Sequence, residues 1–218
     1  MKVIILGGLG DGIVVASIIQ DLAIHTTIEL LGFLNNGDAN TILGYPVFGN
    51  INDWQKLNHK DVYFISALLK TKHSIQRSEL ILSLEIPQNK YCNIIHPSAT
   101  ISRYSSIGKG NLIGPSVNIM PNVTIGNHCS FRASASIGHD CKVQDFCYMG
   151  PNSTLSGGCA LENGAHIGPN ASVVDKVTIH KHTILGAGSV ATKNISPFSV
   201  FFGIPAKKIG IIPVEVHK

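Results

Sequence analysis

The 218-residue sequence predicts an α/β domain over residues 1–90, a parallel β-helix over 91–190 and a short C-terminal capping tail over 191–218. The β-helix is predicted by a large apolar residue at every sixth position from Ile95 to Leu185, without an insertion. A period of six fits neither the 3.6-residue turn of a helix nor a hairpin meander, but it is typical of hexapeptide β-helices. The α/β domain is predicted by strand-like and helix-like segments that alternate around a glycine-rich turn.

The order of elements in the first ninety residues predicts a small Rossmann-like unit with parallel strands. We expect, in order, a strand at Met1–Leu6, a glycine turn at 7–12, a helix at Ile13–Ile24, and strands at Ile28–Leu34 and Val62–Leu68 followed by a helix at His73–Leu84. The glycines would let a phosphate approach the helix N-terminus. Their spacing is not G-x-G-x-x-G, so nucleotide-sugar binding and a merely tight turn both remain open.

In the β-helix, each hexad is expected to form one flat face, and three hexads one triangular coil. The apolar residue points to the axis, and the residue four positions later is small or medium-sized, as at Ala99. Bulk at that corner would force the coil open. The second column contains four of the five cysteines, Cys129, Cys141, Cys147 and Cys159. We interpret them as small buried residues, with zinc ligation or nucleophilic catalysis as the alternatives.

Composition narrows the function classes. Charged residues make up 14% and hydrophobic residues 44% of the chain, which excludes a disordered protein. The net charge of +4 forms no basic run or stripe, so a nucleic-acid binder is not expected. The sequence shows neither an apolar stretch of about 20 residues nor a secretory signal, which predicts a cytoplasmic protein without membrane insertion and with reduced thiols.

One histidine stands out by its place in the repeat. His139 lies two residues after the inward Ile137, on the outer side of a face, and Asp140 follows it. An outward imidazole beside a carboxylate can act as a general base, because imidazole titrates near neutral pH. A solvated surface pair is the alternative. Some hexapeptide β-helices are zinc enzymes of the γ carbonic anhydrase type, with two histidines five residues apart. The repeats here contain no such pair, so no metal is expected.

Three sequence motifs carry a resemblance to a known family. They are Ile95-His96-Pro97-Ser98-Ala99, Ile137-Gly138-His139-Asp140-Cys141 and Gly203-Ile204-Pro205-Ala206-Lys207. Together with the short α/β domain, they resemble the NeuD/PglD-type sugar acetyltransferases of the left-handed β-helix superfamily. The resemblance covers about residues 1–208. It implies a left-handed β-helix, a homotrimer, and transfer of an acetyl group from acetyl-CoA to a nucleotide-linked amino-sugar for bacterial surface glycans.

The resemblance also implies roles for individual residues. His139 matches the general base of a direct attack on the thioester, and Asp140 matches the acidic residue that orients it. The positions that match coenzyme contacts are Tyr148, Gly157 (an oxyanion donor through its N–H), Pro169 and Ala187. The positions that match contacts to the nucleotide-sugar are Gly10, Asp11, Asn35 and Asn36.

Some of these positions depart from the family pattern. Asp11 and Tyr148 stand where histidines are common, Asn35-Asn36 replace an Asp-Asp pair, and Arg132 replaces an Asn. The departures gather around the acceptor. Three functions therefore stay open: an N-acetyltransferase of a nucleotide-linked amino-sugar, a sialic-acid-type sugar O-acetyltransferase, and a non-catalytic nucleotide-sugar-binding or scaffold protein.

Overall fold

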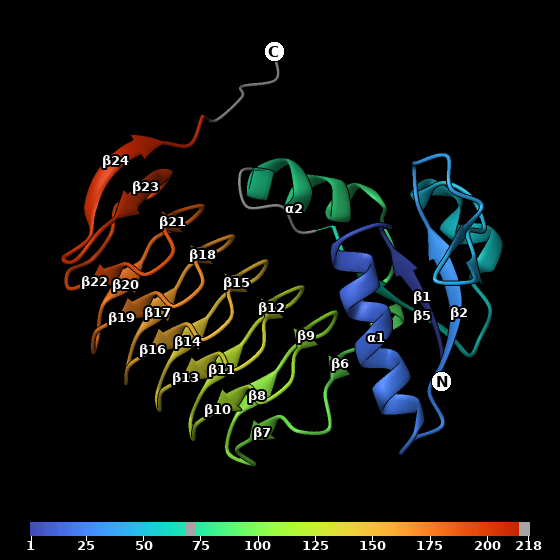
Figure 1. Ribbon diagram of the computed structural model, residues 1–218, viewed down its shortest axis with the longest axis horizontal. Helices are drawn as coiled ribbons and strands as arrows, with labels where there is room; N and C mark the ends of the chain where they lie inside the picture. The colour runs from blue at the N-terminus through green and yellow to red at the C-terminus, as the bar shows by residue number, and fades with distance from the viewer. Residues whose placement is uncertain (69–72, 214–218) are drawn as a thin grey trace.

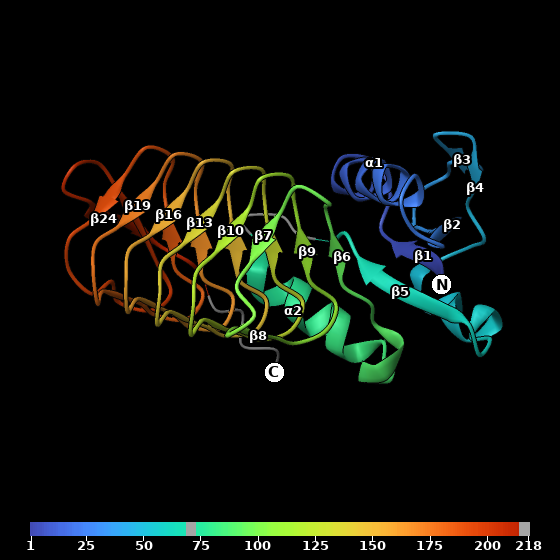
Figure 2. The same ribbon diagram turned by 90° about the horizontal axis from the view of Figure 1, so that it is seen from below.

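The computed structural model describes residues 1–68 and 73–213. It contains an α/β domain packed on one end of a three-sided β-helix, with a C-terminal hairpin at the opposite end (Figure 1). The turned view shows the coils stacked along one axis beyond the α/β domain (Figure 2). Within the described ranges, no helix is long and apolar enough to span a membrane. Residues 214–218 of the predicted capping tail lie outside the described residues.

The α/β domain has the predicted parallel sheet. Strand β1 (Lys2–Leu6) lies between β2 (Glu29–Leu34) and β5 (Val62–Ser66). Helix α1 (Asp11–Ala23) packs Val15, Ala16 and Ile19 into the apolar cluster that includes β1. The helix begins two residues earlier than predicted, since Gly10, at a φ of 81°, already completes the glycine turn.

The remaining elements of this domain are short. The predicted second helix is α2 (Ser74–Ser83), and η3 (Gln88–Lys90) leads into the β-helix. The sequence analysis missed strands β3 (Thr41–Ile42) and β4 (Tyr45–Pro46) and the 3₁₀-helix η1 (Ile51–Leu57). Two-residue strands carry no readable period. The start of η1 does carry a local signal, because Asn50 and Asp53 form a reciprocal capping box.

The β-helix is built from two-residue strands that pair in parallel with strands one coil away. Ile119, for example, pairs with Ile101 in the preceding coil and with Ile137 in the next. This eighteen-residue register gives three sheets along the prism. The β7 sheet comprises β7 (Thr100–Ile101), β10 (Asn118–Ile119), β13 (Ser136–Ile137), β16 (Thr154–Leu155), β19 (Ser172–Val173) and β22 (Val190–Ala191). The β8 sheet comprises β8 (Ser106–Ile107), β11 (Thr124–Ile125), β14 (Lys142–Val143), β17 (Ala160–Leu161) and β20 (Thr178–Ile179).

The third face, the β6 sheet, joins the prism to its caps. Its prism strands are β6 (Ile94–Ile95), β9 (Leu112–Ile113), β12 (Ser130–Phe131), β15 (Tyr148–Met149), β18 (His166–Ile167) and β21 (Ile184–Leu185). It continues into the C-terminal hairpin of β23 (Ser199–Phe202) and β24 (Lys207–Ile211). At the other end, Ile94 and Leu112 pack into the same cluster as α1. The α/β domain is therefore anchored on the first coils.

The two sequence columns form the core of the prism. From Ile113 onward the aliphatic column is buried, and the small column fills the corners. The four cysteines of that column are buried and free of disulfides. Each thiol donates to a main-chain carbonyl, as Cys141 Sγ does to Ser156 O at 3.1 Å. This geometry supports the interpretation of the cysteines as packing residues.

Candidate active site

His139 lies at the corner between the β7 and β8 sheets, just after β13. Its side chain is 65% exposed, on the outside of the prism as predicted. Its Nδ1 lies 2.7 Å from Asp140 Oδ2, while Asn122 Nδ2 donates to Asp140 Oδ1 at 3.1 Å. Asp140 has a φ of 59°, and its N–H donates to Pro121 O at 3.1 Å. The turn thus fixes the carboxylate beside the imidazole.

The hydrogen bonds of Asp140 determine which imidazole nitrogen can accept a proton. The bonds from His139 and Asn122 lower the pKa of the Asp140 carboxyl group, so that it is ionised at neutral pH. An ionised carboxylate only accepts hydrogen bonds, so Nδ1 of His139 carries the proton. The lone pair of Nε2 is then the basic site on this corner.

Gly157 lies one coil beyond His139 and leaves room for its ring. A Cβ at this position would come within 2.7 Å of both Nε2 and Cε1 of His139. The Gly157 N–H donates to Asp175 Oδ1 at 3.0 Å. The predicted role of this N–H as an oxyanion donor stays a prediction, and it requires the bond to Asp175 to be released.

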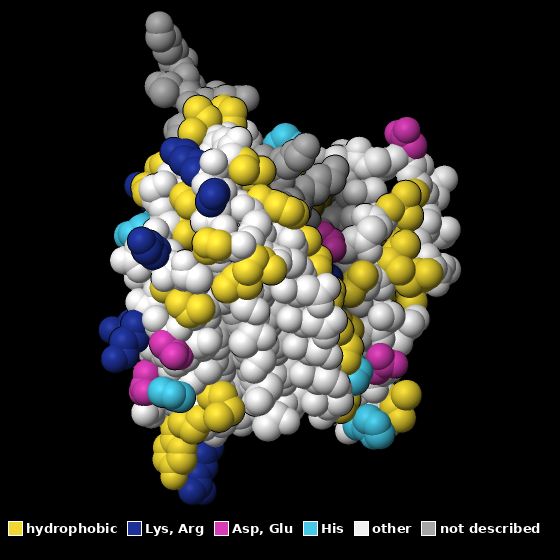
Figure 3. All heavy atoms as spheres, turned by 60° about the vertical axis from the view of Figure 1, so that its left-hand side comes forward, with side chains coloured by type: hydrophobic (Ala, Val, Ile, Leu, Met, Phe, Trp, Pro, Cys, Tyr) yellow, Lys and Arg dark blue, Asp and Glu magenta, His cyan; other side chains and the backbone are white. Residues whose placement is uncertain are grey.

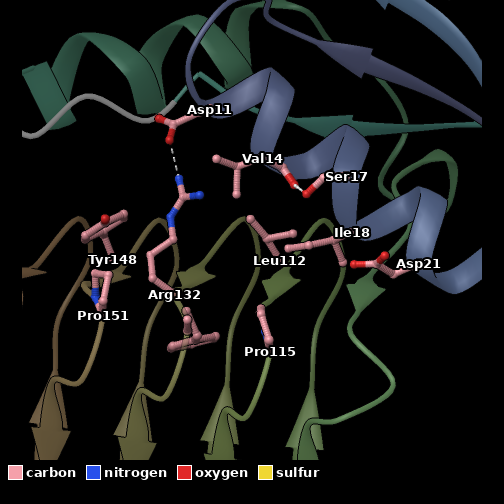
Figure 4. Close-up of a pocket in the computed structure, with 13 residues that line it drawn as sticks. Asp11, Val14, Ser17, Ile18, Asp21, Leu112, Pro115, Arg132, Tyr148 and Pro151 are labelled. Atoms are coloured by element: carbon pink, nitrogen blue, oxygen red, sulfur yellow. Dashed lines mark hydrogen bonds and ion pairs between the residues drawn. The ribbon is translucent and has the colours of Figure 1, made fainter. Parts of the chain in front are cut away.

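A second candidate region is a pocket of about 400 Å³ between α1 and the prism (Figure 4). Asp11, the first residue of α1, forms an ion pair of 2.5 Å with Arg132, which follows β12. The walls are largely apolar. The lining residues are Asp11, Val14, Ser17, Ile18, Asp21, Leu112, Gly114, Pro115, Phe131, Arg132, Ala133, Tyr148 and Pro151.

Tyr148 closes one side of this pocket through an aromatic stack. Its ring lies 4.3 Å from that of His166, nearly parallel, and the Arg132 guanidinium lies 5.4 Å from the centre of the Tyr148 ring. Burial raises the pKa of Tyr148 and lowers that of His166 to about 4. His166 is therefore neutral at pH 7, and the Arg132 guanidinium lies over the face of the neutral Tyr148 ring.

The structure brings only some of the sequence-predicted residues together. Pro169 and Ala187 are exposed at the corner between the β6 and β7 sheets, whereas His139 and Gly157 lie at the next corner, across the β7 sheet. Within one chain, the predicted coenzyme contacts are thus split between two corners and the pocket, which Tyr148 lines, and His139 does not line that pocket.

The predicted acceptor residues are also divided. Gly10 precedes Asp11 at the pocket, while Asn35 and Asn36 follow β2 on the side of the glycine turn. The Asn35 side chain fills the space beside Gly8, and Asn36 Oδ1 accepts the Ile51 N–H at 3.0 Å. Residues such as Ser17 and Asp21 were missed, because only the docking of α1 on the prism makes them pocket residues.

The β7 sheet lies between the two corners and has an uncharged outer face. Its outward strand residues, Thr100, Asn118, Ser136, Thr154, Ser172 and Val190, are all uncharged. The space-filling view likewise shows a broad face with almost no charged side chains, bordered by charged groups at one edge (Figure 3). Along the described residues, no group of three or more His, Cys, Asp or Glu side chains is placed to hold a metal ion.

The prism and the α/β domain resemble those of known proteins. The family model described as the GMPPB C-terminal domain matches residues 90–197, the part that contains the prism. No match is found among curated proteins. Among solved structures, a histidine-to-asparagine mutant of perosamine N-acetyltransferase from Caulobacter crescentus, in complex with CoA and GDP-perosamine, superposes with a TM-score of 0.86. It is 27% identical, over 96% of this chain and 97% of that one.

The protein has the structure of a NeuD/PglD-type hexapeptide-repeat acetyltransferase. Two further structures share its fold: the acetyltransferase domain of PglB from Neisseria gonorrhoeae with acetyl coenzyme A (24% identity, TM-score 0.81, 95% and 98% covered) and WeeI from Acinetobacter baumannii (23%, 0.79, 96% and 100%). At these identities, the two show the fold alone. The comparisons confirm the resemblance, the predicted fold class and the expected enzyme class, a CoA-dependent acetyltransferase. The ligand expected from the sequence, acetyl-CoA or its product CoA, is present in the perosamine N-acetyltransferase and PglB structures.

Proposed function

We propose that the protein transfers an acetyl group from acetyl-CoA to the amine of a nucleotide-linked amino-sugar. The observation that carries the proposal is the exposed, oriented His139–Asp140 pair on a fold whose neighbour holds both CoA and a GDP-linked amino-sugar. The reaction would take place in the cytoplasm and supply bacterial surface glycans.

In this proposal, His139 is the general base. The sugar attacks the thioester directly, so the reaction passes through no covalent acyl-enzyme. Bound acetyl-CoA supplies an acetyl thioester. As the sugar nitrogen forms its bond to the acetyl carbon, the carbon–sulfur bond breaks and the sulfur leaves as the thiol of CoA. Nε2 of His139 accepts the proton that the nitrogen loses, and it returns a proton to the departing sulfur. Asp140 stabilises the imidazolium that forms between these two transfers, through its 2.7 Å contact to Nδ1.

We further propose that the active unit is a homotrimer. A single coenzyme can contact both predicted corners when the His139–Gly157 corner of one copy faces the Pro169–Ala187 corner of the next. Charged side chains are depleted from the cores of interfaces, and the uncharged outer face of the β7 sheet fits that pattern. Closed rotational symmetry would repeat the same seam between each pair of copies.

The direct test is an assay of acetyl-CoA consumption. Acceptors would be UDP-, GDP- and dTDP-linked amino-sugars, with free and CMP-linked sialic acids as the alternatives. Acceleration by an amino-sugar supports N-acetylation, and acceleration by a sialic acid would reassign the enzyme as an O-acetyltransferase. If no acceptor accelerates the reaction, the protein is a binding or scaffold protein and the proposal fails.

A further inference from the structure

The upper end of the pocket between α1 and the prism holds a compact cluster of charges. Arg132 enters it from the prism and Asp11 from the first residue of α1, while Arg77 lies nearby on α2, where the charge of Asp11 still acts on it. The Arg132 side chain is only 9% exposed. Figure 4 shows it rising from the prism to meet Asp11 at the edge of the pocket, beside Val14.

The carboxylate of Asp11 does not provide a hydrogen-bond acceptor for every buried N–H group of this cluster. Nε of Arg132 and Nη1 of Arg77 are buried and have no hydrogen-bond partner among the residues that the structure describes. Burial lowers the pKa of Arg77, while the charge of Asp11 opposes that shift. Asp11 thus pairs with Arg132, and Arg77 has no ion pair among the described residues, which leaves one positive charge without a partner beside the pocket. A buried charge and buried N–H groups without partners are both costly.

The other charged group that lines the pocket is a carboxylate at the opposite end from Arg132. Asp21 lies toward its lower end and is 3.5 Å from His96 Nε2, on the first coil of the prism. Between the two ends, the walls are formed by side chains such as Ile18, Leu112 and Pro115. The pocket is thus apolar along its length and has the buried guanidinium of Arg132 at one end.

We infer that Arg132 binds an oxyanion of the acceptor substrate at this end of the pocket, with Arg77 adding positive charge from α2. The inference rests on the proposed function for the identity of the ligand as a nucleotide-sugar. The planar guanidinium fork binds carboxylate and phosphate oxygens in pairs. The oxyanion is either the diphosphate of the nucleotide-sugar or a carboxylate carried by its sugar ring. Asp11 holds Arg132 in place and competes with the oxyanion for it.

Binding measurements on the intact protein test this assignment. Calorimetric titration with UDP-glucose, UDP-glucuronate, GDP-mannose and GDP-mannuronate compares neutral and acidic sugars on matched nucleotides. The variants are Arg132→Asn, Arg132→Lys, which keeps the charge without the fork, and Asp11→Asn. Lys60→Asn removes an equal charge from an exposed turn before β5, outside the pocket, and serves as the control. Thermal unfolding establishes that each variant is folded.

We expect Arg132→Asn to weaken binding by about tenfold or more, the worth of a charge-assisted hydrogen bond, and Arg132→Lys to weaken it less. Asp11→Asn is expected to strengthen binding, because it removes the competing carboxylate. A merely structural ion pair would instead weaken binding in both variants. If the sugar carboxylate is the source, the acidic sugars bind more tightly than their neutral partners and lose that preference in Arg132→Asn. If the diphosphate is the source, both members of each pair weaken equally.

Unchanged binding in folded Arg132→Asn, or no binding of any of the four probes to the wild type, would overturn the inference. Its failure is separable from failure of the proposed function. Acetyl transfer to an amino-sugar that Arg132→Asn leaves unaffected would refute the anion site and keep the enzyme. Binding that depends on Arg132, without any acetyl transfer, would do the reverse.

Discussion

The exposed corner at His139 and the pocket at Arg132 differ in how the fold creates them. The corner is set by one coil: Ile137 points inward, Gly138 follows, and His139 turns outward beside Asp140. The pocket exists only because α1, more than a hundred residues away in the chain, docks on the β6 sheet. A repeat position can be derived from sequence spacing, whereas a surface between two domains cannot.

The comparison also explains why the two regions suit different tasks. The imidazole on the exposed corner has only the backbone at Gly157 beside its basic nitrogen, so it needs a second surface to position a substrate. The pocket already has two walls and a buried cation. The predictions below separate these two regions, in order of decreasing expected effect.

The largest effect is expected from a charge on the outer face of the β7 sheet. Thr154→Arg would place a cation in the proposed uncharged seam, dissociate the trimer and reduce activity by more than about 10³-fold, because positioning at the shared site is lost. Analytical ultracentrifugation and the acetyl-transfer assay measure both effects. Thr178→Arg, at the matching strand position of the β8 sheet, is the control and should remain an active trimer. An active Thr154→Arg monomer would contradict the seam.

Removal of the base comes next. His139→Ala is expected to lower kcat by about 10²-fold or more and to leave CoA affinity nearly unchanged, since only proton transfer is lost. Steady-state kinetics and calorimetry with CoA check the two parts. Full turnover in this variant would falsify the assignment of the base.

A smaller effect is expected from Gly157→Ala. Its methyl group would come within 2.7 Å of the His139 ring and push it away from its present position. We expect a loss of about tenfold in kcat with an unchanged unfolding temperature, because a displaced base loses part of its contribution. Wild-type kcat in Gly157→Ala would show that the ring has no fixed working position.

The smallest effect comes from protonation of His128 at low pH. It concerns the stability of the fold, so activity at pH 7 should be unaffected. Burial lowers the pKa of His128 to about 4, so between that value and the pKa of about 6.5 of an unfolded chain, only the unfolded state takes up the proton. Stability is therefore complete above this window and falls as the pH is lowered through it, by about 1–2 kcal/mol at pH 5.

His128→Phe should reduce that loss, as measured by urea unfolding at pH 7 and pH 5. Phe146 occupies the equivalent corner one coil later with a similar positive φ, so phenylalanine fits the backbone there. The same acid sensitivity in the variant would mean that other groups, such as His166, account for it.

The sequence predicted the repeat and its His139 corner better than the pocket between the two domains. The hexad columns predicted the prism, its buried cysteines and the outward His139, because each position repeats a local constraint many times. The parallel order around β1 followed from alternating apolar runs. Strands β3 and β4 have no period, and the pairing of Asp11 with Arg132 depends on domain docking, so neither could be derived. Arg132 was noticed only as a departure from a family pattern, and Arg77 gave no signal.

Mixing of two inactive variants tests the central claim, a site shared between copies, most directly. His139→Ala lacks the base, and Ala187→Arg would block the opposite corner, where residue 187 is exposed. If the seam joins these corners, trimers reassembled from an equal mixture have both intact corners at roughly a quarter of their seams and regain activity in that proportion. A mixture that stays inactive, although both variants form trimers, would contradict the shared site.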